Sequence, residues 1–402
     1  MNGYGIGRRA ALGGAAGVAA STLFGRARAQ DTPIRIGVLT DETGQYASSG
    51  GAGSIVAARM AAKDFGGTVM GRGIEILHAD TQNKPDVAGN TARQWYDAGV
   101  DAIIDLPVTP VAAAVQQVAK EKKRTVMITA AAVTEFTSKN CSPVSSHWAD
   151  DTHAMAAGTG KVLTGLGGKT WFFITVNFSF GEALQAEATK VIEANGGKLL
   201  GSTQFPIGST DFSSQIIQAQ SSRARVVGLA SVGGEQVNLI KQAAEFGLQV
   251  GGSQTLAGFL VYITDIHALG LEVAQGLNFP SSFYWDQDEA SRSFGRRFGA
   301  ERNAMPTQNQ ANVYAGTLHF LKAMSQTGTR DATAVNGAMR AMPVDFFGRR
   351  VPMRQDGRVL NELTLYRVKT PNESRAPWDY FAATGSVPAS EAFLAMSPSC
   401  GA

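Results

Sequence analysis

The histidines and cysteines of this 402-residue chain are the side chains that most often bind metals or act as nucleophiles. None of the histidines stands at a metal-type spacing from cysteine, aspartate or glutamate, and no G-x-S-x-G segment indicates a nucleophile elbow. Packing or surface positions are the simpler interpretation of the five histidines, which are His78, His147, His153, His267 and His319. We therefore predict no metal ion, no cofactor and no catalytic residue.

Two glycine-rich segments are similar to phosphate-binding loops, and both fail on spacing. "GLGGKT" at 165–170 has Leu163 where the motif requires glycine, and it precedes its strand instead of following it. "GGAGS" at 50–54 has Val56 where the dinucleotide fingerprint requires its next glycine. Asp80 does stand at the distance of a ribose-binding acid. A nucleotide-dependent oxidoreductase is therefore an alternative function, and the missing glycines count against it.

Adjacent acids and large aromatic side chains are the remaining candidates for chemistry. Asp150 and Asp151 either begin a helix or take part in catalysis, and a helix start is favoured because acids stabilise helix N-termini. Trp148 and Trp285 would either stack on a ligand or pack in the core. Neither pair by itself indicates a function.

The first 29 residues have the pattern of an export signal. Arg8 and Arg9 precede an uncharged stretch of 15 residues, 10–24, and Ala27–Ala29 offers a small-x-small cleavage site. The paired arginines favour the twin-arginine route, with an ordinary secretory signal as the alternative. Cleavage removes four arginines and no acid, so the net charge of +3 becomes −1 and no basic patch remains for nucleic acid. We expect an exported, soluble protein.

Cys141 and Cys400 are the only cysteines. In an oxidising compartment such a pair can form one disulfide, which would tie the C-terminus to a loop early in the chain. Two unrelated thiols are the alternative. A free thiol beside an exported C-terminus is a liability, which favours the bridge.

The segments that must position a site alternate between strand and helix patterns. The strand patterns are apolar throughout, which indicates parallel strands covered on both faces. A first series has strands at 34–40, 74–80, 101–107 and 125–129 and helices at 53–65, 87–98 and 111–120. A second series has strands at 170–176, 198–205, 224–231 and 252–258, with helices near 184–192 and at 235–246. The restart indicates two successive doubly wound units.

The end of the chain has a different pattern. A segment at 275–281 is followed by a long helix around 310–326. The segment 348–369 reads as two strands around a turn at 355–358. The proline-containing segment 370–402 is expected to wrap over the rest as a tail.

The order of these segments resembles that of type I periplasmic binding proteins, in particular the leucine/isoleucine/valine-binding family that feeds ABC transporters. "TGQYASSGGAGSIVAARMAAKDFGG" resembles the first loop and helix of that family, and "GVDAIIDLPVTPVAAAVQQVAKEKKRTVMIT" resembles its third strand, helix and fourth strand. "FSFGEALQAEATKVIEANGGKLLG", "GSTDFSSQI" and "VNLIKQAAEFGL" resemble parts of its second lobe. "MPTQNQANVYAG" and "PWDYF" resemble an aromatic- and organic-acid-type subgroup.

The resemblance implies two doubly wound, Rossmann-like α/β lobes joined by a three-segment hinge, which close on a ligand at the carboxyl ends of the parallel strands. The implied divisions are an export signal at 1–29, lobe 1 at 30–148, lobe 2 at 149–274, a return to lobe 1 at 275–345, and a lobe 2 hairpin with a C-terminal tail at 346–402. The implied partners are a small molecule and the membrane permease of an ABC transporter. The protein would be a periplasmic monomer.

The resemblance places a ligand carboxylate in lobe 1. Thr109, at the start of the third helix, matches a hydroxyl donor of the family, and helix N-termini have free N–H groups. The stretch after the fourth strand, with Ala131, Ala132 and Val133, would supply backbone N–H groups. Small side chains there keep the backbone within reach of a ligand. A tightly packed strand end is the alternative.

The resemblance also indicates that half of an amino-acid site is missing. Ser49 stands where amino-acid binders carry a tyrosine, and it would leave extra room. Val133 is the nearest match to their threonine. Phe180 and Val232 match their lobe 2 tyrosines, and Phe259 matches the acid that neutralises the ligand ammonium. Burying an ammonium without a carboxylate would cost several kcal/mol. We expect an aromatic carboxylate or, next, a short-chain organic acid; an amino acid or amide is the alternative.

A signalling or amide-sensing module on the same fold is a third possible function. Such a module should lack an export signal or carry a membrane anchor. The expected signal and the absence of a second long apolar run count against it.

Overall fold

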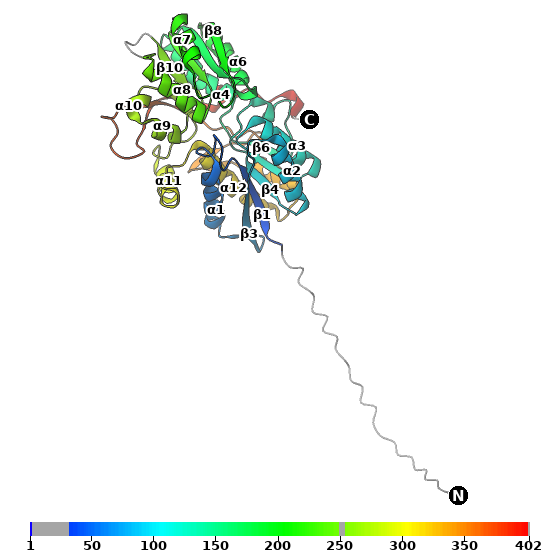
Figure 1. Cartoon of the computed structure of the whole chain (residues 1–402). Helices are drawn as coiled ribbons and strands as arrows, with labels where there is room; N and C mark the ends of the chain where they lie inside the picture. The colour runs from blue at the N-terminus through cyan, green and yellow to red at the C-terminus, as the bar shows by residue number, and fades with distance from the viewer. Residues whose placement is uncertain (2–31, 249–253, 401–402) are drawn as a thin grey trace. The chain divides into compact units, whose positions relative to one another are not determined.

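The strand and helix segments form two mostly parallel sheets, each covered by helices on both faces (Figure 1). This computed structural model describes residues 1, 32–248 and 254–400, and the chain from Pro33 onward forms one compact unit. Apart from Met1, the predicted export signal lies outside the described residues.

The first sheet has the strand order β2-β3-β1-β4-β5-β6, and all neighbours are parallel except β2 and β3. Val38 and Ile104 belong to the core on one face, whereas Leu39 and Ile103 belong to the core on the other, because successive side chains on a strand alternate. The strands of this sheet are β1 (Ile34–Thr40), β2 (Thr68–Val69), β3 (Arg72–Asp80), β4 (Ala102–Asp105), β5 (Thr125–Ile128) and β6 (Ser145–His147). Of these, β1, β4 and β5 carry apolar side chains on both faces.

The second sheet has the order β15-β14-β11-β10-β9-β7-β8, in which β14 is antiparallel to both of its neighbours. Ile174 and Leu229 belong to one core, and Phe173 and Ala230 to the core on the opposite face. The strands are β7 (Thr170–Val176), β8 (Lys198–Phe205), β9 (Val226–Ala230), β10 (Thr255–Gly258), β11 (Asn278–Ser281), β14 (Leu363–Val368) and β15 (Phe381–Val387). The first residues of the predicted strand at 252–258 lie outside the described part.

Helices connect the parallel strands. The longest, α12, begins at a capping box in which Thr307 and Gln310 satisfy each other's backbone N–H groups, and it ends at Gly328 in the left-handed conformation. The helices are α1 (Gly51–Asp64), α2 (Pro85–Asp97), α3 (Thr109–Lys122), α4 (Thr152–Met155), the π-helix η2 (Ala156–Lys161), α5 (Val162–Gly165), α6 (Ser179–Ala194), α7 (Ser213–Ser222), α8 (Gly234–Glu245), α9 (Ile263–Leu269), α10 (Leu271–Ala274), α11 (Glu289–Arg302), α12 (Gln308–Thr327), α13 (Ala332–Ala341) and α14 (Ala389–Ala392). In the described part of the chain, the 3₁₀ turns are η1 (Thr134–Thr137) and η4 (Pro398–Cys400).

The predicted two-lobe α/β fold is confirmed. We call the first sheet with its helices lobe 1 and the second sheet with its helices lobe 2. Three segments carry the chain between them: one between β6 and α4, one between β11 and α11, and one between β13 (Arg349–Val351) and β14. These three segments form the hinge. No helix in the described residues combines the length and apolar character that a membrane crossing requires.

The predicted return to lobe 1 at residue 275 is too early. Strand β11 pairs with β10 and β14 and therefore belongs to the lobe 2 sheet. The predicted start of the last lobe 2 segment at 346 is also too early, because Phe346 and Val351 pack in the lobe 1 core. The remaining boundaries stay predictions.

The predicted hairpin at 348–369 is wrong in its pairing. Gly357 does turn the chain, with its N–H bonded to the carbonyl of Arg354, but only Met353 and Val359 pair across the turn. The residues before the turn instead form β13, which pairs with β12 (Val344–Phe346). The residues after it form β14 in the lobe 2 sheet.

Candidate ligand-binding site

A pocket lies where the carboxyl ends of strands from the two sheets face each other. Its walls are the loops after β1, β4 and β5 of lobe 1 and after β7, β9 and β10 of lobe 2. The space amounts to about 360 Å³, counting the part that opens to solvent. The lining residues are Tyr46, Ser49, Pro107, Val108, Thr109, Ala130, Ala132, Phe178, Phe180, Val232, Leu260 and Tyr262. Open α/β sheets bind ligands at this edge, so we take this pocket as the candidate site.

Main-chain N–H groups and hydroxyls are the polar groups on the lobe 1 side. Ala130 and Ala132 line the pocket, and their N–H groups have no hydrogen-bond partner among the described residues. Thr109 is the first residue of α3, and its hydroxyl and N–H group also have no partner there. A helix N-terminus carries partial positive charge, so this side of the pocket can bind an anion.

Two of the predicted backbone donors do not face the pocket. The N–H group of Ala131 donates to the carbonyl oxygen of Leu106 at 3.0 Å. Ala131 and Val133 both pack in the core beside α2 and α3, with 2% and 4% exposure. Their contribution is therefore to packing. Of the three predicted residues, Ala132 is the one that lines the pocket, together with Ala130.

Lobe 2 lines the pocket with apolar side chains. Phe178 and Phe180 lie at the start of α6 with ring centroids 6.0 Å apart. Val232 follows β9 and Leu260 follows β10. The predicted residues Phe180 and Val232 are thus pocket residues, and this side suits the apolar body of a ligand.

Phe259 is not a pocket residue, contrary to the prediction. It is fully buried in the lobe 2 core, with its ring centroid 5.7 Å from that of Phe173. Leu260 lines the pocket instead, because neighbouring side chains in extended backbone point to opposite sides. Leu260 is also apolar, so this wall of the pocket carries no acid.

Two tyrosines line the pocket that the sequence did not predict. Tyr46 lies in the loop after β1 and Tyr262 in the loop after β10. Burial raises the pKa of both phenols above the usual value, so both are neutral hydroxyls at physiological pH. The rule that loops at the carboxyl edge form the site could have found them. Ser49 does line the pocket, but Tyr46 lies beside it, so the expected extra room is not supported.

The N-terminus of α12 holds pocket loops from both lobes. Thr307 and Gln310 donate to the lobe 1 loop that contains Ser49, whereas Gln308 and Asn309 donate to the lobe 2 loop that contains Tyr262. The bonds are Thr307 Oγ1 to Ser49 O at 2.6 Å, Gln310 Nε2 to Gly50 O at 3.0 Å, Gln308 Nε2 to Val261 O at 3.3 Å, and Asn309 Nδ2 to Tyr262 Oη at 2.9 Å. These bonds stabilise the approach of the two walls.

No charged side chain lines the pocket in the part of the chain that the structure describes. The acid with the largest electrostatic effect on Tyr46 is Glu235, which adds to the effect of burial on the phenol pKa. One Glu235 oxygen accepts from the N–H of Gly208, and the other is buried without a partner. Burial raises the pKa of this carboxyl. Within the described residues, no three His, Cys, Asp or Glu side chains are grouped as metal ligands.

A buried carboxyl lies at the end of β4, just before the pocket residues Pro107 to Thr109. Asp105 is fully buried, and burial raises its pKa to about 6, even though hydrogen bonds from the hydroxyls of Thr40, Ser54 and Thr129 oppose that shift. These hydroxyl contacts are poorly aligned, since neither carboxyl oxygen has a partner of good geometry in the described part. Both Asp105 and Leu106 have positive φ angles, 93° and 70°, which residues with side chains rarely adopt. The backbone is therefore strained at the entry to the pocket.

The other predicted residues have structural roles. Asp151 caps α4 by accepting from the N–H of Ala154 at 2.9 Å, which confirms the predicted helix start. Trp148 is fully buried in the lobe 1 core, and Trp285 packs against the cores of both lobes.

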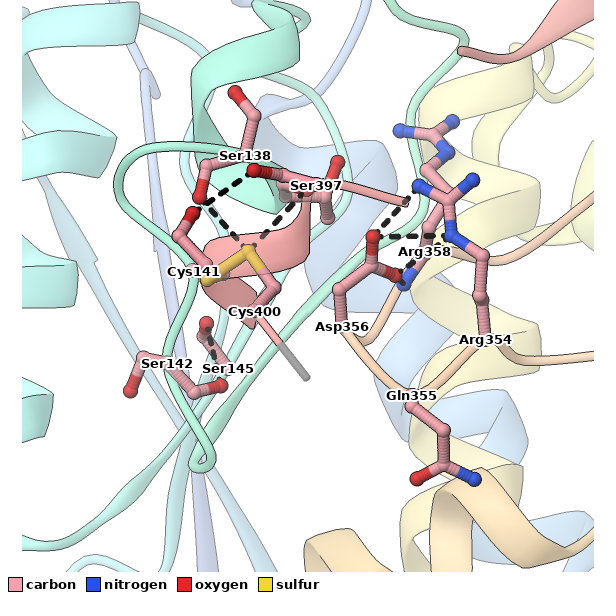
Figure 2. Close-up of a disulfide and its surroundings, with 12 residues drawn as sticks. Ser138, Cys141, Ser142, Ser145, Arg354, Gln355, Asp356, Arg358, Ser397 and Cys400 are labelled. Carbon is pink, nitrogen blue, oxygen red and sulfur yellow. Dashed lines mark hydrogen bonds and ion pairs between the residues drawn. A yellow bond between two sulfur atoms is a disulfide. The ribbon is translucent and has the colours of Figure 1, made fainter. Parts of the chain in front are cut away.

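The two cysteines are bonded in the structure, with Cα atoms 5.9 Å apart. Figure 2 shows the last turn of the tail, which carries Cys400, against the loop of Cys141. The same tail covers the third hinge segment, where Arg354 donates to the carbonyl of Leu394 at 2.6 Å. The bridge therefore fastens the tail over the hinge, outside the pocket.

Two facing lobes with a pocket at the carboxyl ends of their parallel strands define a solute-binding protein. The periplasmic binding protein family model matches residues 33–375, and the chain belongs to this family. The family is one of binding proteins, so the chain is not an enzyme and the oxidoreductase alternative is dropped. Comparison with the curated proteins gives no match.

Solved structures support the same assignment. A periplasmic binding protein from Burkholderia mallei is 40% identical, with a TM-score of 0.88 over 92% of this chain and 98% of that one. A branched-chain amino acid ABC transporter periplasmic ligand-binding protein from Burkholderia xenovorans is 34% identical, with a TM-score of 0.81 over 90% and 96%. A solute-binding protein of an ABC transporter from R. palustris, in complex with benzoate, is 18% identical, with a TM-score of 0.79 over 89% and 97%, and shows the fold alone.

Proposed function

We propose that this protein is the solute-binding component of an ABC importer and captures a small carboxylate that has no α-amino group. The observation that carries the proposal is the uncharged pocket with anion-binding groups at one end. Ala132 N–H and the Thr109 hydroxyl would hold the carboxylate, as backbone donors at a helix N-terminus do. An ammonium group would enter the same pocket without a carboxylate to neutralise it.

The ligand body is proposed to be aromatic. Phe178 and Phe180 supply flat apolar surface, and Val232 and Leu260 close the same wall. The R. palustris protein was solved in complex with benzoate, so this fold can hold an aromatic acid. Benzoate-like and phenylpyruvate-like acids are therefore the first candidates, followed by short-chain organic acids.

Periplasmic delivery and transport complete the proposal. The pattern at residues 1–29 would export the protein, and the loaded, closed form would dock on a membrane permease as a monomer. Closure would be a hinge motion of the three crossing segments.

Branched-chain amino acid binding is the second candidate. The Burkholderia xenovorans relative bears that name, and one buried oxygen of Glu235 has no partner among the described residues. Because the charge of Glu235 reaches Tyr46, that carboxyl could neutralise a ligand ammonium at the lobe interface. This candidate requires Glu235 to turn towards the pocket.

A thermal-shift screen of the protein without residues 1–29 tests both candidates. Ligands that bind only the folded state raise the melting temperature by mass action. The proposal expects stabilisation by benzoate or phenylpyruvate and none by leucine or valine. Stabilisation by leucine alone, abolished in Glu235→Gln and retained in the control Glu182→Gln, would establish the second candidate instead.

A further inference from the structure

A chain of buried polar groups joins the hinge to the pocket loop after β5. Arg358 lies in the third hinge segment, His147 is the last residue of β6, and both are at most 1% exposed. Nη1 of Arg358 donates to Nδ1 of His147 at 2.7 Å. On the other side of the ring, Nε2 of His147 lies 2.8 Å from the carbonyl oxygen of Ala131.

These two contacts determine the proton position on the imidazole. A guanidinium can only donate, so Nδ1 of His147 must accept from Arg358, and the proton is on Nε2. That proton is then donated to the carbonyl of Ala131. Burial, with the Arg358 charge as the next cause, holds the pKa of His147 well below its usual value. The ring is neutral and cannot accept a second proton without losing the bond from Arg358.

The bond to Ala131 determines the direction of the next N–H group. The Ala131 carbonyl and the Ala132 N–H belong to one planar trans peptide unit, so they point in opposite directions. Because His147 holds the carbonyl on the buried side, the N–H of Ala132 points to the pocket side. Thr152 donates its N–H to the Ala132 carbonyl at 2.8 Å, so the following peptide unit is also held.

Arg358 is in turn held by groups of the first hinge segment and the tail, and the first segment is bonded to the second. In the first segment, it donates to the carbonyl of Ala149 and lies 3.6 Å from Asp151 Oδ2. Asp150, the neighbouring acid, accepts from the N–H of Ser282 in the second segment at 3.0 Å. Phe393 of the tail covers the guanidinium, with its ring centroid 4.2 Å from Cζ.

The backbone repeats the same connection. The N–H of His147 donates to the carbonyl of Gly357 at 2.9 Å, and the N–H of Val359 donates to the carbonyl of His147 at 3.0 Å. The end of β6, from which the first hinge segment starts, is thus held in fixed register with the third hinge segment.

We propose that His147, held by Arg358, is a positioning residue that aims the N–H group of Ala132 at the ligand carboxylate. This inference rests on the proposed function for the identity of the ligand. It assigns the hinge a second role besides rotation: the segment that bends during closure also orients the donor that binds the anion.

Two variants of His147 separate positioning from packing. Gln places a donor where Nε2 stands, whereas Asn is too short for that position and only offers an acceptor near Nδ1. We expect His147→Gln to bind benzoate within about threefold of the wild type. His147→Asn should bind it roughly 10-fold or more weakly, because the N–H group of Ala132 would no longer donate to the charged carboxylate of the ligand. Affinity for neutral benzamide should change much less. Calorimetry measures these values. A folded His147→Asn protein with wild-type benzoate affinity would overturn the inference.

A second measurement does not depend on any ligand. Imidazole ¹⁵N chemical shifts of the protein should show a neutral ring with its proton on Nε2 from pH 5 to 8. Hydrogen exchange at the peptide 129–133 should be faster in His147→Asn than in His147→Gln. A ring that titrates in this range, or a proton on Nδ1, would overturn the inference even if carboxylates bind. A wild-type protein that binds no carboxylate but has the expected ring would instead overturn the proposed function.

Discussion

The pocket and the hinge use charge in opposite ways. Among the described residues, no charged side chain lines the pocket, although the proposed ligand is an anion. The hinge, in contrast, buries Arg358, Asp150 and Asp151 almost completely. The difference follows from occupancy. Charges in the hinge find their partners within the protein itself, whereas a charge in the pocket would lose its partner whenever the ligand leaves, at a cost of several kcal/mol. Backbone N–H groups and hydroxyls avoid that cost.

Loss of the hinge cation is the variant with the largest expected effect. Arg358→Met leaves Asp151 buried without its nearest cation, and removing one partner of a buried pair costs about 3–5 kcal/mol. We expect the free energy of unfolding, measured in urea, to fall by that amount. The exposed Arg350→Met is the control and should change it by less than about 0.5 kcal/mol. If Arg358→Met were as stable as the wild type, the buried charges of the hinge would make no net contribution to stability.

Removal of the disulfide should have the next largest effect. Cys141 and Cys400 are separated by 259 residues, and closing so long a loop restricts the unfolded chain. We expect the double variant Cys141→Ala/Cys400→Ala to lose about 3–4 kcal/mol of unfolding free energy. Reduction of the wild type should match the variant, and reduction of the variant should change nothing. Benzoate affinity should stay within about threefold, because neither cysteine lines the pocket.

Asp105 combines features of the two regions: it is a buried acid, as in the hinge, and it directly precedes the pocket residues. Its pKa is raised from an ordinary value of 3.8 to about 6, so the folded state binds the proton more tightly than the unfolded state. The contribution of Asp105 to stability should therefore be highest below pH 4, fall by about 2–3 kcal/mol as the pH rises to about 6, and stay low above that.

Asp105→Asn should abolish this pH dependence and be at least as stable as the wild type at pH 7.5. Unfolding in urea at pH 4, 5, 6 and 7.5 measures it, with the exposed Asp86→Asn as the control. A wild-type profile in Asp105→Asn would assign the pH dependence to other buried acids, such as Asp150.

The smallest effect is expected from a single hydroxyl of the pocket. Thr109→Val keeps the shape of the side chain and removes one donor, so benzoate affinity should fall by about 1 kcal/mol, roughly fivefold. Thermal stability should not change. Thr91→Val on α2, which does not line the pocket, is the control for calorimetry. An unchanged affinity in Thr109→Val would mean that the backbone donors alone bind the carboxylate.

The sequence predicts the strands well where apolar side chains form a short run or alternate along it. Strands β1, β7 and β8 begin and end at the predicted residues, because short uninterrupted apolar or alternating runs are typical of strands and rare in other elements. Strand β6 was not predicted, because its three residues, Ser145 to His147, are polar and buried. The predicted pairing of the hairpin at 348–369 was wrong for another reason. Local sequence indicates the turn, but tertiary contacts decide which strands β13 and β14 pair with.

The site could be predicted at the level of loops and less well at the level of side chains. Thr109, Ala132, Phe180 and Val232 line the pocket as expected. The prediction of Phe259 was wrong by one residue, because a shift of one position in extended backbone exchanges the buried and exposed sides. The burial of Ala131 depends on hydrogen bonds to Leu106 and His147, which no local pattern indicates.

The disulfide also changes what a protease can do to this protein. All three hinge segments and the whole lobe 2 sheet lie between Cys141 and Cys400. One cut in any surface loop of that interval would leave a single covalent molecule, with the two pieces still joined through sulfur. Such a nicked protein would run as one band without reductant and as two bands with it. A second cut is needed before a fragment can leave.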